Sequence, residues 1–384
     1  MRKKVLIIAT VVKTHICAFH LPYIEMFHNR GYETYVAAKN DCGCGNGVPE
    51  IPFCDHFIDI PFSRNPASPQ NITAYRRLKK LFRENRFDIV QCNTPIGGAL
   101  GRLAARKARK KGTRVVYIAH GFHFFKGGSK AAWLLYYPIE KLLSRLTDTL
   151  VTINREDYEL AAHSFQPKEL VLTNGIGVRV NDAIETVCDR EAVRRSFGIP
   201  LDAKILVSVG ELRELKNHKT ILHAMGRLTR DDLYYIIVGS GAYREELEHC
   251  AKELYLSNRV RLPGFCTNVF EIVKACDIFC FPSLREGLPS ALIEAMACGM
   301  PVLASDIRGS RDLIMPGVGG YLYAPHDTDG FADGIKRLCA DPALCKRMGN
   351  ENLLRAKRYD LSVVMPQYEA IYFRDDTAAK EADK

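Results

Sequence analysis

One stretch of the chain decides its fold class: Ser283-Leu284-Arg285-Glu286-Gly287-Leu288-Pro289-Ser290-Ala291-Leu292-Ile293-Glu294. An apolar run at 277–282 precedes it and predicts a buried strand, so Glu286 falls on a strand-to-helix turn and Glu294 about two turns into the helix. Backbone N–H groups and the helix dipole at such a turn suit a phosphate, and a carboxylate suits ribose hydroxyls. The stretch therefore predicts a nucleotide diphosphate site. The alternative is an ordinary helix with two surface glutamates.

Strand and helix patterns alternate on both sides of this stretch. In the first half, strand patterns at 5–9, 33–38, 88–91, 114–119 and 150–153 alternate with helix patterns at 20–30, 72–85, 97–110 and 156–164. The second half restarts with strand patterns at 204–209, 234–238, 260–262, 277–281, 301–304 and 320–323. This alternation is typical of parallel sheets covered by helices on both faces. We therefore expect an α/β chain of two doubly wound, Rossmann-like domains facing across a cleft.

The length of the chain also favours two domains. Its 384 residues are too many for one ordinary domain, and the polar stretch at 180–191 is the best linker. We expect domains at 1–184 and 185–360, followed by a helix at 361–375 that packs back on the first domain. Because parallel sheets bind ligands beyond the carboxyl ends of their strands, the site is expected in the cleft between the domains.

The net charge of +10 is unevenly distributed. Residues 1–184 hold 27 Lys and Arg against 15 Asp and Glu, a net +12, whereas residues 185–384 hold 27 against 29, a net −2. The excess lies mainly at 76–83 and 102–111. It indicates that the first domain meets an anionic surface or acceptor, although basic helices are often only solvated faces. No aromatic-interleaved basic motif is present, so no nucleic acid partner is expected.

The sequence shows no sign of a membrane span. No run reaches the ~18 apolar residues that a spanning helix needs. The N-terminus imitates a signal peptide, but its short apolar run favours a first buried strand. The 13 cysteines form no regular framework and are expected to be reduced thiols. We expect a cytoplasmic protein that binds weakly to an anionic membrane surface, on the inner face of the cell membrane.

The block from Glu286 to Glu294 resembles the donor-binding signature of retaining glycosyltransferases of the two-Rossmann-domain, family-4 type, which have the GT-B fold. The resemblance covers essentially the whole chain, and the stretch at 124–158 is similar to bacterial capsule and exopolysaccharide glycosyltransferases. It implies that the first domain binds the acceptor and the second binds a nucleotide-sugar, expected to be a UDP-sugar. It also implies transfer of a hexosyl-type sugar, with retention of configuration, to a lipid-linked saccharide or polysaccharide acceptor.

The resemblance assigns residues to the donor diphosphate. Lys216 matches the motif lysine that neutralises it, and with Glu286 and His120 it makes up the expected catalytic set. Glu211 stands in place of the usual arginine, which leaves open whether Arg213 supplies the missing charge.

Two glycine turns are similar to donor-binding segments of the family. Gly239 and Gly241 resemble a Gly-x-Gly turn at a strand end, with a plain turn as the alternative. Gly264 and Phe265 resemble the segment that faces the nucleobase, where a Pro-Gly turn explains the pattern equally well. The complete expected donor set is Arg213, Lys216, Gly239, Gly241, Gly264, Phe265, Glu286, Gly287, Leu288, Pro289, Ser290 and Glu294.

Histidines of the first domain are the remaining candidates. His120 matches the family's histidine near the donor sugar. His15, His20 and His123 are expected near the acceptor, with a purely structural role as the alternative. The aromatic and partly basic stretch at 124–138 fits either a membrane-interface element or a simple core helix.

No metal and no cofactor are expected. The chain carries no Asp-x-Asp motif before a suitable strand end, and no His, Cys and Asp cluster with metal-ligand spacing is evident. Lys216 and helix amides would supply the electrostatic stabilisation that a divalent ion gives elsewhere. The leaving diphosphate would help to deprotonate the acceptor hydroxyl on the same face of the sugar.

Two other functions fit parts of the pattern. A nucleotide-sugar epimerase shares the architecture but lacks an acceptor site, so the basic, aromatic first domain argues against it. A non-catalytic nucleotide-sugar-binding protein is disfavoured by the intact Lys216, Glu286, Glu294 and His120. Products formed from the donor alone separate an epimerase from a transferase, and absence of turnover with every acceptor would favour the binding protein.

Overall fold

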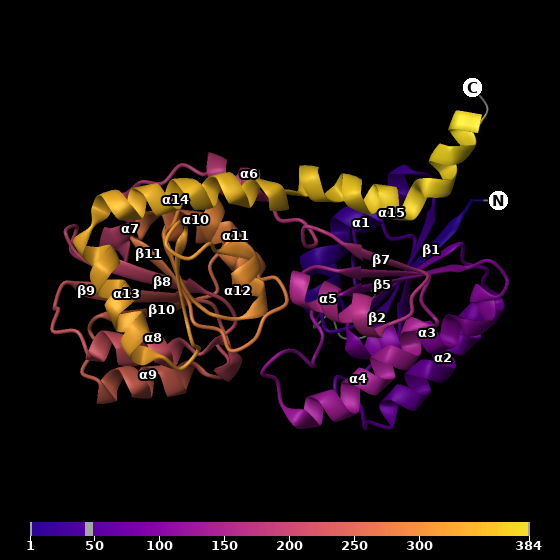
Figure 1. Cartoon of the computed structure of the whole chain (residues 1–384), viewed down its shortest axis with the longest axis horizontal. Coiled ribbons are helices and arrows are strands. Elements are labelled where there is room, and N and C mark those ends of the chain that lie inside the picture. The colour runs from indigo at the N-terminus through magenta and orange to yellow at the C-terminus, as the bar shows by residue number, and fades with distance from the viewer. Residues whose placement is uncertain (1, 43–48, 383–384) are drawn as a thin grey trace. The chain divides into compact units, whose positions relative to one another are not determined.

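The computed structural model describes residues 2–42 and 49–382, with side chains as far as Arg374. Two compact units make up the chain, Met1–Ile176 with Met365–Lys384 and Gly177–Val364 (Figure 1). Each unit is one parallel sheet covered by helices, which confirms the predicted α/β class. No helix among the described residues is both long and apolar enough to cross a membrane.

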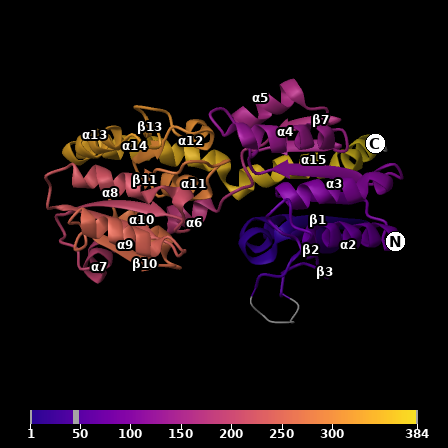
Figure 2. The same ribbon diagram turned by 90° about the horizontal axis from the view of Figure 1, so that it is seen from below.

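The first unit is built on a seven-stranded sheet of order β3-β2-β1-β4-β5-β6-β7, and Figure 2 shows β3 and β7 on opposite sides of this unit. Its strands are β1 (Lys4–Val11), β2 (Glu33–Lys39), β3 (His56–Asp59), β4 (Ile89–Asn93), β5 (Arg114–Ala119), β6 (Thr149–Thr152) and β7 (Glu169–Leu172). Its helices are η1 (Val12–His20, a π-helix), α1 (Leu21–Asn29), α2 (Gln70–Glu84), α3 (Pro95–Arg109), α4 (Lys130–Ser144), α5 (Arg155–Ser164) and most of α15 (Leu361–Ala382). From Val5 to Ala9, strand β1 is apolar on both faces and buried, as expected of a central parallel strand.

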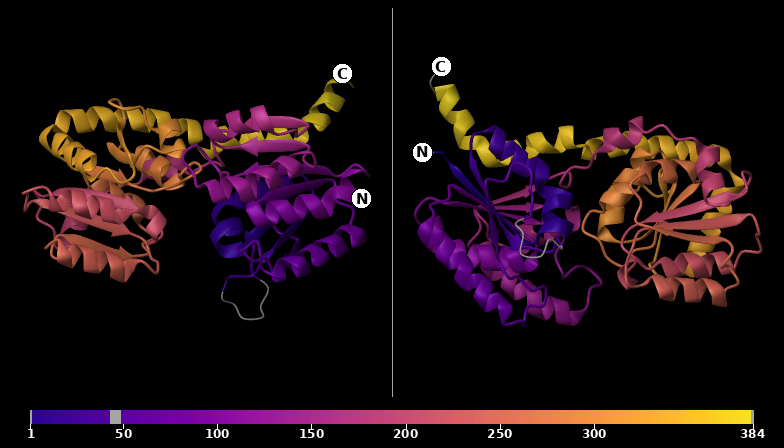
Figure 3. Two further views of the ribbon diagram at one scale, coloured as in Figure 1. Left: turned by 60° about the horizontal axis from the view of Figure 1, so that its bottom comes forward. Right: turned by 180° about the vertical axis from the view of Figure 1, so that it is seen from behind.

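The second unit has a six-stranded sheet of order β10-β9-β8-β11-β12-β13, which the right-hand view in Figure 3 shows as one layer between helices. Its strands are β8 (Lys204–Val209), β9 (Leu233–Val238), β10 (Val260–Gly264), β11 (Ile278–Phe281), β12 (Val302–Ser305) and β13 (Gly320–Tyr323). Its helices are α6 (Val180–Glu185), α7 (Arg190–Ser196), η2 (Glu214–Lys216), α8 (His218–Gly226), α9 (Arg244–Glu253), α10 (Val269–Ala275), α11 (Ser290–Ala297), α12 (Arg308–Leu313), α13 (Thr328–Ala340), α14 (Pro342–Ala356) and η3 (Lys357–Tyr359).

The two units divide at other residues than the sequence predicts. Residues 177–184 belong to the second unit, not the first. The reason is a set of local hydrogen bonds: Val178 N donates to Tyr359 O over 2.9 Å, and Val180 N donates to Asp360 Oδ2 over 3.0 Å. The chain passes from the second unit back to the first between Val364 and Met365, within α15. The end of the chain therefore belongs to the first unit.

One residue of the predicted basic surface is in the core. Arg102 on α3 is 1% exposed, and its Nη2 donates to Glu140 Oε2 over 2.8 Å. Its guanidinium also stacks 3.8 Å from the centroid of the Tyr117 ring. Because a buried charge needs a partner, Glu140 on α4 explains why this arginine leaves the solvated face that its neighbours occupy.

Helix α4 packs aromatic rings toward the core and leaves an apolar side exposed, and its role as a membrane-interface element stays a prediction. The Tyr137 and Trp133 rings pack against buried Phe124 on the core side. The opposite side of the helix is apolar and exposed, with exposed fractions of 83% for Leu134 and 63% for Leu142.

Candidate active site

The candidate site in the second unit lies at the point where the strand order of the sheet reverses: β9 and β10 lie on one side of β8, and β11 to β13 lie on the other. β8 is the first strand of this sheet, and β11 pairs with it on the side opposite β9. The loops that follow β8 and β11 therefore meet beyond the carboxyl ends of the strands, the usual ligand position in open parallel sheets. Leu284 N donates to Leu215 O over 2.9 Å, which ties the two loops together.

Lys216 and Glu286 form an ion pair across these loops. Lys216 Nζ lies 2.7 Å from Glu286 Oε1, and each side chain is 22% exposed. Asn217 fixes the loop that carries Lys216. Its backbone is left-handed, with φ 54°, and its Nδ2 donates to Pro282 O and Pro325 O. An ammonium group has three N–H donors, so Lys216 retains donors for a ligand while Glu286 orients it.

The turn that carries Glu286 is held from behind by α12. Arg308 Nε donates to Glu286 O over 3.0 Å, and Arg308 is buried. A Cβ on Gly309 would lie 2.6 Å from Gly287 O, so only a glycine allows α12 to approach this closely. Arg308 and Gly309 were not predicted as part of this site, because nothing in their local sequence pattern links Arg308 to a turn 22 residues earlier.

Helix α11 begins at Ser290 without a side-chain cap. The free amide groups of a helix start attract anions, and this start lies directly after the Glu286 turn. We refer to Lys216, Glu286, Glu294 and the first turn of α11 as the Lys–Glu site. Gly287, Leu288 and Pro289 join Glu286 to Ser290, the first residue of α11, and contact of these four residues with a donor stays a prediction.

Glu294 lies in the second turn of α11. Burial raises the pKa of its carboxyl group, and its carboxylate makes no hydrogen bond or ion pair with any other described residue. A charged group removed from water in this way is costly without a partner. The position suits a carboxylate that acquires hydrogen-bond donors from a ligand; its assignment to ribose remains a prediction.

The glycine turns pack the neighbouring loops. A Cβ on Gly239, where φ is 145°, would lie 1.9 Å from Gly210 O, and a Cβ on Gly241 would lie 2.2 Å from Leu212 O. Gly239 N also donates to Gly264 O over 2.9 Å. These contacts give both glycines a structural role beside the β8 loop. Their contact with a donor, like that of Gly264 and the 79% exposed Phe265, stays a prediction.

Arg213 does not stand free in place of the missing arginine. Its Nη1 lies 3.4 Å from Glu211 Oε2, and both side chains are about half exposed. The two charges therefore offset each other locally, and Lys216 is the cation that pairs with the Glu286 carboxylate on the turn before α11.

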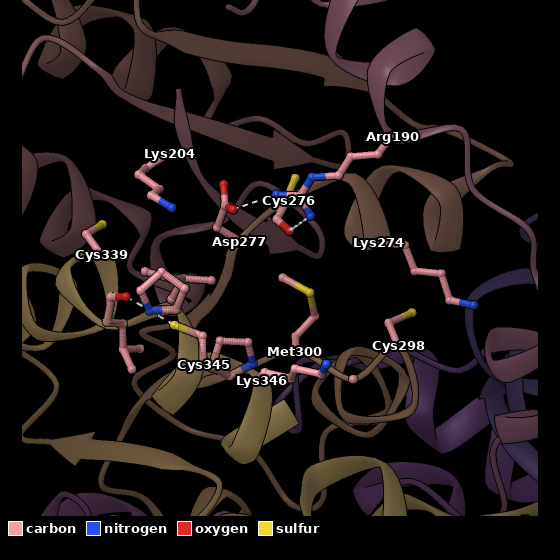
Figure 4. Close-up of a pocket in the computed structure, with 15 residues that line it drawn as sticks. Arg190, Lys204, Lys274, Cys276, Asp277, Cys298, Met300, Cys339, Cys345 and Lys346 are labelled. Carbon is pink, nitrogen blue, oxygen red and sulfur yellow. Dashed lines mark hydrogen bonds and ion pairs between the residues drawn. The ribbon is translucent and has the colours of Figure 1, made fainter. Parts of the chain in front are cut away.

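A hollow at the opposite end of the strands of this sheet is a separate feature (Figure 4). It has a volume of about 250 Å³ and lies at the amino ends of β8, β11 and β12, where Lys204, Asp277 and Met300 line it. Burial raises the pKa of its Cys298 to about 12 and that of its Cys339 to about 11, so these thiols stay protonated at neutral pH. Protonated thiols are poor nucleophiles, and the hollow is not at the ligand-binding edge of the sheet.

In the first unit, three histidines meet at the corresponding chain reversal. β1 is flanked by β2 and β4, and β5 follows β4. His15 and His20 belong to η1, which follows β1, and His120 follows β5. Residues five apart lie near the same face of a π-helix, whereas they diverge in an α-helix of 3.6 residues per turn. The π-helix therefore places the rings of His15 and His20 together, with their Nε2 atoms 3.2 Å apart.

We call His15, His20 and His120 the histidine cluster. The ring centroid of His120 lies 4.8 Å from that of His15 and 5.4 Å from that of His20. Burial lowers the pKa of His120 to about 4 and the pKa values of His15 and His20 well below the usual range, so the cluster is neutral at pH 7. His123 lies elsewhere, with its ring 4.9 Å from that of Tyr136.

The cluster corrects one sequence-based expectation. The spacing of the residues indicated no metal-type cluster, yet one nitrogen from each of the three rings lies within 4.8 Å of the others. Sequence spacing could not reveal this, because the fold brings position 120 beside positions 15 and 20 through three neighbouring strands.

Known proteins resemble both units. Residues 23–177 match the model of "Glycosyltransferase Family 4", and residues 189–354 match that of "Glycosyl transferases group 1". A putative glycosyltransferase EpsD from Bacillus subtilis is 39% identical over 377 residues, which cover 97% of each chain. The chain belongs to the family-4 glycosyltransferases. This confirms the family predicted from the Glu286 to Glu294 block, and with it a glycosyltransferase that uses a nucleotide-sugar.

Two further known proteins are similar to this glycosyltransferase. A UDP-Gal:alpha-D-GlcNAc-diphosphoundecaprenol alpha-1,3-galactosyltransferase from Escherichia coli is 29% identical over 314 residues, covering 78% of this chain and 80% of the relative. The crystal structure of Anabaena HepE in complex with UDP has a TM-score of 0.76 at 18% identity, over 97% of this chain and 99% of HepE. At that identity the likeness shows the fold, and it confirms the predicted GT-B architecture.

Proposed function

We propose that this glycosyltransferase transfers a sugar from a UDP-sugar to a lipid-linked saccharide in exopolysaccharide biosynthesis, with retention of configuration. The observation that carries the proposal is the Lys216–Glu286 pair, a 2.7 Å contact on the turn before the uncapped start of α11, where backbone amides can bind an anion. The EpsD relative supports the exopolysaccharide context. The E. coli relative acts on UDP-Gal and a diphosphoundecaprenol-linked sugar, which supports the donor and acceptor classes.

The chemistry follows from the charges of this site. The bond between the sugar C1 and the diphosphate oxygen breaks, and negative charge develops on that diphosphate. Lys216 and the amides at the start of α11 stabilise this charge, and Glu294 accepts hydrogen bonds from the ribose. The acceptor oxygen forms the new bond to C1, and its proton passes to the leaving phosphate oxygen on the same face. This scheme leaves electrostatic stabilisation to side chains and amides, so we propose that it needs no divalent ion.

The acceptor side of the proposal rests on the surface of the first unit. A groove of about 370 Å³ between α2 and α3 is lined by the cations Arg76, Lys79, Arg83, Arg106 and Lys107 over an apolar floor. None of these five has an acidic partner among the described residues. Arg77 and Lys80 are engaged elsewhere: Arg77 Nη1 donates to Asp59 O, and Lys80 pairs with Glu84.

The exposed face of α4 adds an apolar element to this basic surface. Leu134, Leu135, Ile139 and Leu142 are all exposed along one side of the helix. An exposed apolar stripe with nearby cations is typical of helices that lie in a membrane interface. We propose that this unit binds an anionic membrane surface weakly, where a lipid-linked acceptor resides.

The experiment that tests the proposed function is a transfer assay. The purified enzyme is incubated with radiolabelled UDP-glucose, UDP-galactose, UDP-GlcNAc or UDP-GalNAc and undecaprenyl-diphosphate-linked monosaccharides, and the anomeric configuration of any product is read by NMR. A product with the donor's anomeric configuration supports the proposal. An isomerised nucleotide-sugar formed without acceptor would indicate an epimerase, and tight UDP binding without turnover on any acceptor would favour a binding protein.

A further inference from the structure

Two buried amide side chains link the histidine cluster to a backbone carbonyl group. Because that carbonyl oxygen can only accept, it determines which atom donates in each hydrogen bond of the chain. The carbonyl group is that of Ile8. Asn93 Nδ2 donates to it over 3.1 Å, so Asn93 Oδ1 faces the other way and accepts from Gln91 Nε2 over 3.2 Å. Both amide side chains are fully buried. The orientation of Asn93 therefore follows from a backbone atom, and that of Gln91 follows from Asn93.

A second contact fixes the Gln91 amide independently. The Tyr372 hydroxyl donates to Gln91 Oε1 over 2.7 Å. Tyr372 is buried and comes from α15, the last helix of the chain. Reversing the Gln91 amide would set its oxygen against Asn93 Oδ1, with no hydrogen between them.

The same hydrogen-bond directions determine which ring nitrogen carries the proton in His20 and in His15. The second hydrogen of Gln91 Nε2 points to His20 Nδ1 at 3.3 Å. Nδ1 must therefore hold a lone pair, and neutral His20 carries its proton on Nε2. That proton is donated to His15 Nε2 over 3.2 Å, so neutral His15 carries its proton on Nδ1. An imidazolium at either position would bring two N–H groups face to face, and burial opposes that charge as well.

This polarity argues against a metal ion on all three rings, although their nitrogen atoms are close enough. A metal-binding imidazole keeps a lone pair on the ligating nitrogen and donates its other N–H to an acceptor. Gln91 presents a donor to His20 instead, and the His20 Nε2 atom carries a proton. The lone pair on His15 Nε2 already accepts the hydrogen bond from His20 Nε2.

The two groups that remain point to a neutral ligand. His15 is partly exposed, and its Nδ1–H makes no hydrogen bond within the described part of the chain. His120 Nε2 is buried and has no hydrogen-bond partner there either. A hydroxyl group can accept and donate at once, which matches the His15 donor and the unsatisfied nitrogen of His120, whose ring centroid lies 4.8 Å from that of His15. An anion would gain little from a cluster without charge.

We propose that Gln91 is a positioning residue that fixes the tautomers of His20 and His15, so that His15 offers a neutral Nδ1–H, beside His120, to a sugar hydroxyl of the substrate. The proposal rests on the proposed function, because it takes the ligand of this cluster to be a sugar. It gives Tyr372 and Asn93 an indirect part, since both hold the Gln91 amide in one orientation.

The test is the variant Gln91→Glu, which keeps the shape of the side chain and replaces its donor by an acceptor. Long-range proton–nitrogen NMR spectra of the full chain, labelled with ¹⁵N-histidine, report which ring nitrogen carries the proton; His15→Asn and His20→Asn assign the signals. In the native protein we expect the proton on Nε2 of His20 and on Nδ1 of His15. In Gln91→Glu we expect His20 to gain a proton on Nδ1, and the transfer rate to fall about 10- to 100-fold.

UDP affinity provides the internal control, because the Lys–Glu site belongs to the other unit. It should change by less than about twofold, well under the tenfold that 1.4 kcal/mol represents. The variant Gln91→Met removes the hydrogen bonds without adding a charge, and it should give a mixture of tautomers and a smaller loss in rate. It serves as the test if Gln91→Glu does not fold.

Three results would overturn the inference. One is a native His15 with its proton on Nε2. Another is a reversed tautomer in Gln91→Glu, or mixed tautomers in Gln91→Met, with an unchanged transfer rate. The third is stoichiometric, submicromolar binding of Zn²⁺ that shifts the signals of all three rings, which would make the cluster a metal site. Absence of transfer by the native enzyme would instead count against the proposed function, while the spectra would still decide the tautomers.

Discussion

The Lys–Glu site and the histidine cluster occupy equivalent places in their sheets and differ in charge. Each lies where the first strand of its unit is flanked by later strands on both sides, β8 in one unit and β1 in the other. The Lys–Glu site pairs an ammonium with a carboxylate and adds helix amides, whereas burial keeps the histidine cluster neutral. The same topology thus provides a place for a ligand, and the side chains that follow the strands decide whether it suits a phosphate or a hydroxyl.

The largest effect should come from removing the cation of the Lys–Glu site. Lys216→Ala should lower the transfer rate roughly 100- to 1,000-fold, the range for loss of one group that stabilises developing charge. Lys216→Arg keeps the charge and should retain more activity than Lys216→Ala. The rates are measured at saturating donor. Equal rates for the native enzyme and Lys216→Ala would show that the charge on the diphosphate is stabilised elsewhere.

Glu294 should matter for binding of the nucleotide. Glu294→Ala should weaken UDP binding about 10- to 100-fold, because charged hydrogen bonds to the ribose are lost. Isothermal titration calorimetry measures this, with Glu245→Ala on the exposed side of α9 as a matched control. If both variants bind UDP as the native protein does, Glu294 is not a ribose ligand.

The first unit should bind anionic vesicles through two separable contributions. Arg106→Ala with Lys107→Ala should weaken binding about 30-fold at low salt, since each cation contributes about 1 kcal/mol near a charged bilayer. The effect should shrink in 1 M salt, where screening falls to about 3 Å. Leu134→Gln with Leu142→Gln should weaken binding at both salt concentrations. Equal cosedimentation with neutral and anionic vesicles would mean that α2 and α3 are only solvated faces.

The free enzyme should be more stable without the Glu294 charge. Burial raises the pKa of this carboxyl group above 4.5. A folded-state pKa above the unfolded value means that the stability from the protonated form is present at low pH and is lost as the pH rises through the folded pKa. Glu294→Gln should therefore have a higher Tm than the native protein at pH 7, and the two should converge near pH 4. A lower Tm at pH 7 would show that the carboxylate has a stabilising partner.

The smallest effect is expected from chelation. Activity should be unchanged in excess EDTA, because Lys216 and the α11 amides carry the charge stabilisation in the proposed mechanism. Loss of activity that manganese or magnesium restores would show that the donor diphosphate is bound through a metal ion.

The sequence was most informative where the structure is local. The apolar run before Glu286 predicted β11, and the following pattern predicted α11, because strand and helix periodicities need only neighbouring residues. The family of the chain followed from the same block. Lys216 was predicted as a site residue because it matches a family motif. Its 2.7 Å contact with Glu286 could not be predicted, because that contact depends on β8 and β11 being neighbours in the sheet.

The remaining features depend on contacts between distant segments. Gln91 and Asn93 look like ordinary strand residues, and only the fold shows that Gln91 contacts His20 while Asn93 holds the Gln91 amide. The π-helix at 12–20 has no propensity signal that distinguishes it from an irregular loop. Arg102 was assigned to a basic surface because the acidic partner that buries it, Glu140, lies 38 residues away.

The most direct test of the Lys–Glu site is a crystal structure of the enzyme with UDP. We predict that the diphosphate lies at the amino end of α11, within hydrogen-bond distance of Lys216 Nζ, and that the ribose hydroxyls donate to Glu294. A diphosphate bound elsewhere, such as in the hollow lined by Lys204 and Arg190 at the opposite end of the strands, would contradict this assignment.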